Sequence, residues 1–82
     1  VTRAEMAAFL ERLYEALTGR DCTGEHPFTD IAVSSYAYNS VGCIYALDVT
    51  KGRSAEVYAP DDQVTRAEMA AFLERLYEAL TS

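Results

Sequence analysis

Basic residues are scarce in this 82-residue sequence, and it contains no long apolar run. Seven Lys and Arg residues stand against 13 Asp and Glu residues, which gives a net charge of −6. Nucleic acids and anionic membrane surfaces both favour dense Lys and Arg patches, so neither is an expected partner. No apolar run approaches the roughly 20 residues that a membrane-spanning helix needs, and we therefore expect no membrane insertion.

Histidine is rarer still, because His26 is the only one in the chain. A catalytic histidine needs a nucleophile and an orienting acid, and the sequence identifies no such set. Asp61 and Asp62 are not followed by the ligand series of an EF-hand. We therefore expect neither an enzyme nor a bound metal or other cofactor.

The sequence has no initiator Met, no basic and apolar leader and no sorting tail. We therefore expect a mature or recombinant fragment. Eighty-two residues are enough for one small domain but not for two.

One segment occurs twice, since VTRAEMAAFLERLYEALT at residues 1–18 returns unchanged at 64–81. The large apolar residues of each copy recur at i, i+3, i+4, i+7, i+8 and i+11, the pattern of an amphipathic helix. They are Met6, Phe9, Leu10, Leu13, Tyr14 and Leu17 in the first copy and Met69, Phe72, Leu73, Leu76, Tyr77 and Leu80 in the second. The copies predict helices over residues 3–18 and 66–80, each starting in a T-x-x-E capping box.

Polar positions of the repeated segment are expected to face outward, where folding tolerates almost any polar residue. They include Glu11, Arg12 and Glu15 with their counterparts Glu74, Arg75 and Glu78. Identity at such positions indicates recent duplication or deliberate construction more than functional constraint.

Another helix is expected over residues 35–47, where apolar residues keep helical spacing behind a Ser34 or Ser35 cap. Gly42 within it costs about 1 kcal/mol relative to Ala. It therefore indicates close packing against another backbone, or a Cys43 that must approach a partner. Loops rich in Gly, Pro and polar residues separate the helices, so the predicted class is all-α.

Five motifs in a fixed order make the chain similar to the S-layer homology (SLH) repeat of bacterial cell-surface proteins. They are PFTDI at 27–31, SYAYNSVGCIYAL at 35–47, VTKG at 49–52, YAPDD at 58–62 and VTRAEMAAFL at 64–73. The form with a Cys in the central helix is most similar to SLH repeats from actinobacteria. The resemblance implies one complete repeat over residues 20–82, preceded by the terminal helix of another repeat over residues 1–19.

Two features depart from the family pattern. Asp48 stands where the family usually has Gly before its turn, although Asp also tolerates the left-handed backbone region. SLH modules usually act as three consecutive repeats with ligand grooves between neighbours. With one repeat and one extra helix, this chain is expected to form at most one groove.

The resemblance implies noncovalent anchoring of a secreted protein to the cell wall, outside a Gram-positive bacterium. In the family, the T-R-A-E segment helps to bind secondary cell wall polysaccharide through an anionic or pyruvylated sugar. The corresponding residues are Thr65, Arg66 and Glu68, with the copies Thr2, Arg3 and Glu5. In the first turn of a helix, free N–H groups and a guanidinium group can converge on one carboxylate. Alternatively, Thr and Glu only cap the helix, and Arg is solvated or pairs with Asp30 or Asp62.

Tyrosines could stack on a sugar ring. Tyr36 and Tyr38 are expected to be exposed and available for this contact. Tyr45 and Tyr58 are expected to pack in the core.

Because the resembled family is extracellular, Cys22 and Cys43 favour one disulfide, which stabilises by about 3 kcal/mol in the loop-entropy model. Zinc binding by Cys22, His26 and Cys43 with Asp21 or Glu25 is an alternative, although the spacing matches no familiar zinc motif. Free buried thiols are another alternative.

A self-assembling structural repeat, natural or engineered, is the alternative function. A chain with two copies of one helix can exchange them between protomers, and head-to-tail exchange that does not close produces a filament. The expected partners are therefore wall polysaccharide and neighbouring SLH repeats or identical subunits.

Overall fold

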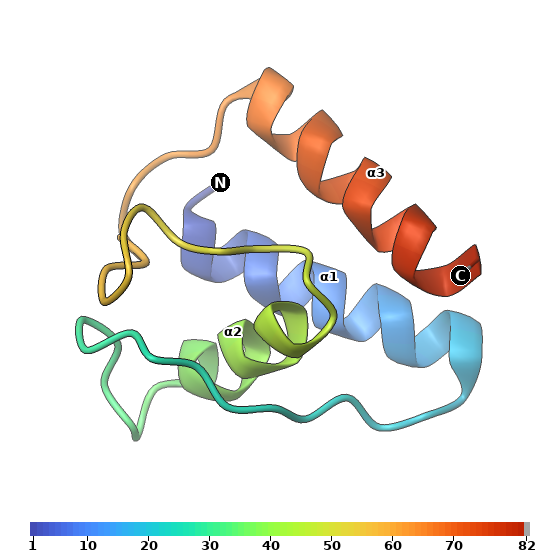
Figure 1. Ribbon diagram of the computed structural model, residues 1–82, viewed down its shortest axis with the longest axis horizontal. Helices are drawn as coiled ribbons and strands as arrows, with labels where there is room; N and C mark the ends of the chain where they lie inside the picture. Colours follow the sequence, from blue (N-terminus) through green and yellow to red (C-terminus); the bar gives the residue numbers. More distant parts are fainter. Residues whose placement is uncertain (82) are drawn as a thin grey trace.

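The computed structural model describes residues 1–81, which form the helices α1 (Arg3–Thr18), α2 (Tyr36–Ala46) and α3 (Arg66–Thr81). This arrangement confirms the predicted all-α class, and each predicted helix boundary agrees within one residue. Helix α1 lies between the other two, and within residues 1–81 α2 and α3 make no contact with each other (Figure 1). None of the three described helices is long and apolar enough to cross a bilayer.

Capping explains where α1 and α3 begin. The Glu5 N–H donates to Thr2 Oγ1 over 3.1 Å, and the Thr2 N–H donates to Glu5 Oε1 over 2.8 Å. Thr65 and Glu68 repeat both bonds at the start of α3, at 3.1 and 3.0 Å. Both predicted capping boxes are therefore present.

The core lies on both sides of α1 and includes residues of the loop before α3. Its largest fully buried side chains are Tyr58, Met6, Leu10, Ile44, Leu76, Val41, Val49, Thr50 and Cys43. Burial of Tyr58 was predicted, but the prediction for Tyr45 is wrong because this side chain is 37% exposed. Its ring stands nearly perpendicular to that of Phe28, with an interplanar angle of 89° and ring centroids 5.5 Å apart.

A disulfide between Cys22 and Cys43 ties the loop after α1 to α2. It confirms the predicted pairing and excludes the free thiols and the zinc site, since both sulfur atoms are bonded to each other. Beside it, a Cβ added to Gly42 would collide with the carbonyl oxygen of Gly24. Gly42 therefore marks close backbone packing, one of the two predicted explanations.

The segment that follows α2 turns sharply at residues 48–52. Asp48 has φ 63° and Gly52 has φ 80°, so both occupy the left-handed region. The resemblance had placed Asp48 at this glycine position, and the turn is formed as expected. A Cβ on Gly52 would collide with the ring of Phe28, which fixes the turn against the core.

The loop before α3 is held by the carboxylate of Asp30. Its oxygens accept from the N–H groups of Tyr58 at 3.0 Å and Ala59 at 2.8 Å. Although burial raises the pKa of Asp30, these hydrogen bonds and the charge of Arg3 outweigh it and lower that pKa. Asp30 therefore positions the segment on which the N-terminus of α1 rests.

Candidate functional site

Arg3 is the first residue of α1, and it is only 3% exposed. Its Nε donates to the carbonyl oxygen of Tyr58 over 2.7 Å, and its Cζ lies 4.4 Å from the centre of the Tyr58 ring. The Tyr58 hydroxyl donates back to the Arg3 carbonyl oxygen over 3.1 Å. Arg3 is thus a buried, rigidly held cation rather than the solvated residue of the alternative hypothesis.

Two guanidinium groups share the carboxylate of Glu68, which projects from α3. Arg3 Nη1 lies 3.9 Å and Arg53 Nη1 lies 3.5 Å from Glu68 Oε2. Arg53 also reaches Asp62, with Nη2 3.6 Å from Oδ2. The carboxylate paired with Arg3 is therefore Glu68, and not Asp30 or Asp62.

These contacts set the ionisation of the group. Burial lowers the pKa of Arg3 and raises the pKa of Tyr58 to about 12, although the charge of Arg3 partly opposes the second effect. The hydrogen bond from the Thr65 backbone, helped by the charges of Arg53 and Arg3, lowers the pKa of Glu68. At neutral pH Tyr58 is therefore protonated and Glu68 is ionised.

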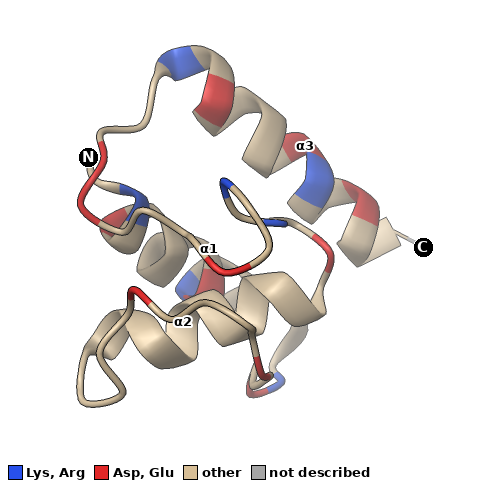
Figure 2. Ribbon diagram, turned by 60° about the vertical axis from the view of Figure 1, so that its left-hand side comes forward, with Lys and Arg blue, Asp and Glu red and all other residues tan. Residues whose placement is uncertain are grey.

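A hollow of about 210 Å³ lies beside Arg3, between the 48–52 turn and α3. It is lined by Arg3, Asp48, Thr50, Lys51, Gly52, Phe72 and Arg75. Three of these seven residues are cationic and one is acidic, although the chain as a whole has a charge of −6. In Figure 2, basic residues occur both on the loop between α2 and α3 and on α3 itself. We call this hollow the cationic groove, since its lining favours an anionic ligand.

An aromatic ring lies at the centre of the cationic groove. The guanidinium Cζ atoms of Arg3 and Arg75 each lie 5.6 Å from the centre of the Phe72 ring. Arg75 Nη1 also donates to the Val49 carbonyl oxygen over 3.3 Å, which attaches α3 to the turn. Lys51 is the least constrained of the three cations, because its 3.6 Å pair with Asp48 is solvent-exposed. The groove thus combines two cations that are held beside a buried ring with one exposed cation.

The structure does not bring the sequence-predicted binding residues together. Of the eight, only Arg3 lines the cationic groove, and Glu68 contacts it through its ion pair. Thr2, Glu5 and Tyr36 line a separate hollow of about 420 Å³. Tyr36 is exposed, whereas the expected exposure of Tyr38 is wrong: its ring is partly buried against His26, with centroids 4.5 Å apart.

Backbone N–H groups at the two T-R-A-E segments differ in availability. In α1, the Arg3 N–H donates to the Asp62 carbonyl oxygen at 2.8 Å and the Ala4 N–H to the Pro60 carbonyl oxygen at 2.9 Å. The loop before α3 therefore occupies the N–H groups that were expected to bind an anion. Within residues 1–81 no such carbonyl group reaches the first turn of α3, where Arg66 and Thr65 are exposed.

Sequence reasoning missed Lys51 and Arg75. Lys51 is the only lysine in the chain and lies in the VTKG motif, so its position next to a predicted turn was an available signal. Arg75 had been assigned to the outward-facing positions together with its copy Arg12. Only the packing of α3 against the turn could distinguish the two.

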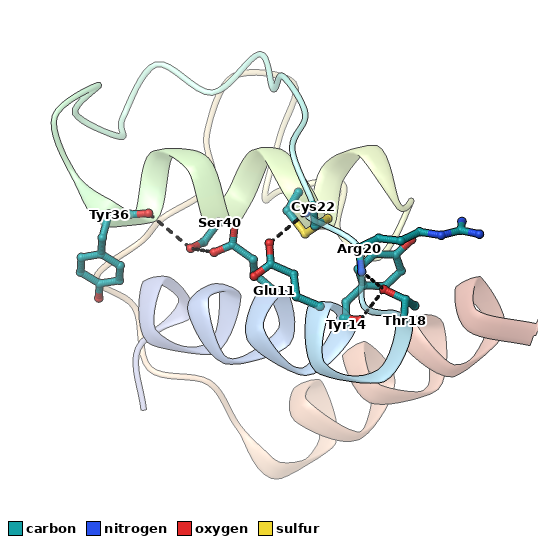
Figure 3. Close-up of a disulfide and its surroundings, with 9 residues drawn as sticks. Glu11, Tyr14, Thr18, Arg20, Cys22, Tyr36 and Ser40 are labelled. Carbon is teal, nitrogen blue, oxygen red and sulfur yellow. Dashed lines mark hydrogen bonds between the residues drawn. A yellow bond between two sulfur atoms is a disulfide. The ribbon is translucent and has the colours of Figure 1, made fainter.

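Two of the outward-facing assignments, both in α1, are wrong. Glu11 Oε1 accepts from the Ser40 hydroxyl on α2 over 2.8 Å (Figure 3). Glu15 Oε2 accepts from the Cys22 N–H over 2.9 Å. Both carboxylates therefore attach α1 to the segment that follows it, at Cys22 and Ser40.

The pattern of the S-layer homology domain matches residues 27–70, more than half of the chain. The chain belongs to the S-layer homology domain family. This is a non-catalytic domain, and membership identifies the chain as a cell-surface anchoring module.

Three enzymes contain segments similar to this SLH chain. They are an amylopullulanase of Thermoanaerobacterium thermosulfurigenes (37% identity over 81 residues), exoglucanase XynX of Acetivibrio thermocellus (36% over 81) and an endoglucanase of Bacillus sp. strain KSM-635 (31% over 80). The alignments cover 95, 95 and 98% of this chain but only 4, 8 and 8% of the enzymes. The SLH chain thus spans less than a tenth of these relatives and does not include their catalytic parts. No solved structure matches it.

Proposed function

We propose that this SLH chain is a noncovalent anchor that binds an anionic secondary cell wall polysaccharide, outside a Gram-positive bacterium. The observation that carries this proposal is the cationic groove, a cluster of three cations around an aromatic ring in an otherwise acidic chain. A pyruvylated sugar suits such a groove, because it joins a carboxylate to a ring with an apolar face.

Different residues of the cationic groove have different roles in binding the sugar. Lys51 and Arg75 are placed to meet the carboxylate, while the buried ring of Phe72 supports the guanidinium groups of Arg3 and Arg75 from below. Arg3 has one rotamer fixed by Tyr58, so its charge is available without an ordering cost on binding. Because Arg3 is held in place and Lys51 is exposed, the groove can bind an anionic sugar at several positions along a polymer.

The remaining residues of the two T-R-A-E segments would make further contacts with the polymer. Thr65 and Arg66, with Glu68, lie at the exposed start of α3, where a following SLH repeat would complete a second groove. Thr2, Glu5 and Tyr36 line the neighbouring hollow and would contact a further sugar of the polymer. Tyr38 is assigned only to support of this surface, because its ring is partly buried.

Calorimetric titration with purified wall polysaccharide tests the proposal. Lys51→Ala should weaken binding roughly tenfold, or about 1.4 kcal/mol, because it removes an exposed cation without disturbing the core. Arg20→Ala is the matched control, since Arg20 is an exposed cation in the loop after α1 and outside the cationic groove. Polymer from which the pyruvyl groups have been removed should bind both variants equally weakly.

Unchanged affinity in both Lys51→Ala and Arg75→Ala would reject the cationic groove as the binding site. A chain that forms filaments or rings and has no affinity for wall polymer would instead support the alternative function, a self-assembling structural repeat.

A further inference from the structure

The two identical helices bury different faces. In α1 the buried residues are Arg3, Ala4, Met6, Ala7, Ala8 and Leu10. In α3 they are only Phe72 and Leu76. Ala67, Ala70, Leu73 and Tyr77 are exposed on α3, whereas their counterparts in α1 are buried or partly buried. We call these four residues the free face of α3, which lies at one edge of the molecule (Figure 1).

The structure shows what covers this face when it belongs to α1. Helix α2 packs against α1, and polar contacts fix the register. Glu11 accepts from Ser40, Glu15 accepts from the Cys22 N–H, and Arg3 donates to the Tyr58 carbonyl oxygen. Residues 20–63 therefore form a surface that is complementary in shape and charge to this 18-residue sequence.

The corresponding polar groups of α3 lack such partners. Glu74, Glu78 and Arg66 are exposed, and their side chains make no hydrogen bond or ion pair to any of residues 1–81. Each would find a partner if α3 took the position of α1 on a second copy, because the two sequences are identical. Glu74 would meet Ser40, and Arg66 would meet Tyr58.

We propose that the free face of α3 is a docking surface for a second copy of this chain, and that α3 of one copy replaces α1 of the other against residues 20–63. The displaced α1 then takes the position that α3 occupies in the isolated chain. In a closed dimer or ring every position is then filled by the same sequence, whereas an open chain keeps one unfilled α3 position at one end and one undocked α3 at the other. The inference is independent of glycan binding.

The arrangement of the two helices permits this exchange. Their N-terminal ends are joined by a hydrogen bond of 2.8 Å from the Val64 N–H to the Val1 carbonyl oxygen. Their C-terminal ends line one hollow, which includes Thr18 and Leu80. The helices therefore lie side by side in the same direction, and α1 needs only a sideways shift about Gly19 to reach the neighbouring position.

Concentration controls the balance between the two forms. The incoming α3 presents the same side chains as the departing α1, so the interaction energy with residues 20–63 changes little. Association is then governed by mass action and by the entropy of the linkers, as in domain swapping. Open head-to-tail exchange gives chains of increasing length, and closed exchange gives dimers or rings.

Cysteine cross-linking tests the exchanged position directly. Glu74 and Ser40 lie on α3 and α2, which make no contact within one chain. A short bis-maleimide reagent is therefore expected to join the two Cys of E74C/S40C only between copies. After refolding at high concentration and treatment with this reagent, we expect covalent dimers and longer species on a denaturing gel.

Two variants control this experiment. E11C/S40C joins residues whose side chains are in contact, so the same reagent, which spans the length lost from Glu11, should close within one chain and leave it monomeric. E74C alone measures random dimer formation. The proposal is overturned if E11C/S40C closes while E74C/S40C gives no more covalent dimer than E74C alone.

Light scattering against concentration gives a second, cysteine-free test. Ala70 is exposed, but its counterpart Ala7 has no exposed surface, so Ala70→Phe leaves the isolated chain intact and cannot enter the α1 position. It should abolish the larger species formed by the unaltered chain. Ala55→Phe adds the same bulk in an exposed loop and should retain them. An unaltered chain that stays monomeric at every concentration contradicts the proposal.

Discussion

Helices α1 and α3 share all their residues, yet Leu10 has no exposed surface while its counterpart Leu73 is 39% exposed. The phenylalanines show the reverse, with Phe9 48% and Phe72 5% exposed. Since intrinsic helix propensity and local sequence are equal, each difference is caused by the neighbours of the helix alone. Comparing α1 with α3 therefore separates the contribution of the helix sequence to stability from the contribution of the place of the helix in the fold.

The comparison also explains why the apolar stripe of the repeated segment is wider than either copy uses. One part of it faces α2 from α1, and another part faces α1 from α3. A helix with neighbours on both sides would bury both parts at once. The same reasoning applies to polar residues, since Glu11 is bonded only in the first copy and Arg75 reaches the turn only in the second.

The largest expected difference between the copies concerns the leucines. Leu10→Ala should lower the free energy of unfolding by about 4 kcal/mol, because it opens a cavity in the core. Leu73→Ala should cost about 1 kcal/mol, since 39% of this residue already faces solvent and its truncation opens no enclosed cavity. Urea unfolding of both variants measures the difference, and equal losses would contradict the buried position of α1.

The phenylalanines should reverse the order of the copies. Phe72→Ala should cost about 3 kcal/mol, because its ring fills the contact between α3 and the rest of the chain. Phe9→Ala should cost about 1 kcal/mol for its exposed ring. A larger loss at Phe9 in the same urea experiment would show that α3 does not pack as described.

The arginines should differ by a smaller amount. Arg3→Ala leaves the Tyr58 carbonyl oxygen without its donor and should cost about 2 kcal/mol. Arg66→Ala should change stability by less than about 0.5 kcal/mol, because Arg66 is exposed. Thermal unfolding of the two variants and of Arg3→Lys measures this, with Arg3→Lys expected to lie between them. Equal melting temperatures for Arg3→Ala and Arg66→Ala would rule out a structural role for the buried guanidinium group.

The smallest difference is expected at the capping boxes, where the copies should behave alike. Hydrogen bonds from Thr2 and Thr65 lower the pKa values of Glu5 and Glu68 in the folded chain. A lowered folded pKa contributes stability above the unfolded pKa, and that contribution disappears as the pH falls from the unfolded pKa through the folded one. Glu5→Gln and Glu68→Gln should each flatten the pH dependence of the unfolding midpoint over this range. If only one variant did so, the two caps would not be equivalent.

Much of the local structure could be predicted because its causes are local. Capping boxes, helical periodicity and the left-handed turn at Asp48 depend on residues a few positions apart. The resemblance to the SLH family added the pairing of Cys22 with Cys43, which spacing alone left open. The close packing at Gly42 was predicted correctly, because glycine destabilises a helix and its presence there indicates that another backbone passes close by.

The rest depends on contacts between distant residues. No rule based on local sequence can assign different burial to Leu10 and Leu73, since their neighbours in sequence are the same. The cationic groove is formed by α1, the turn and α3, so Lys51 and Arg75 were not recognised as members of one site. Tyr45 followed the helical pattern of core residues, but in the folded chain it lies beside Phe28 and stays 37% exposed.

The covalent link between Cys22 and Cys43 has a further consequence for a module that works outside the cell, where proteases are present. A single backbone cut anywhere between these two residues leaves the fragments joined through sulfur. The part that carries α3 and the turn then stays attached to the part that carries α1. Proteolytic release of the anchored cargo at this segment would therefore require a reductant as well as a protease.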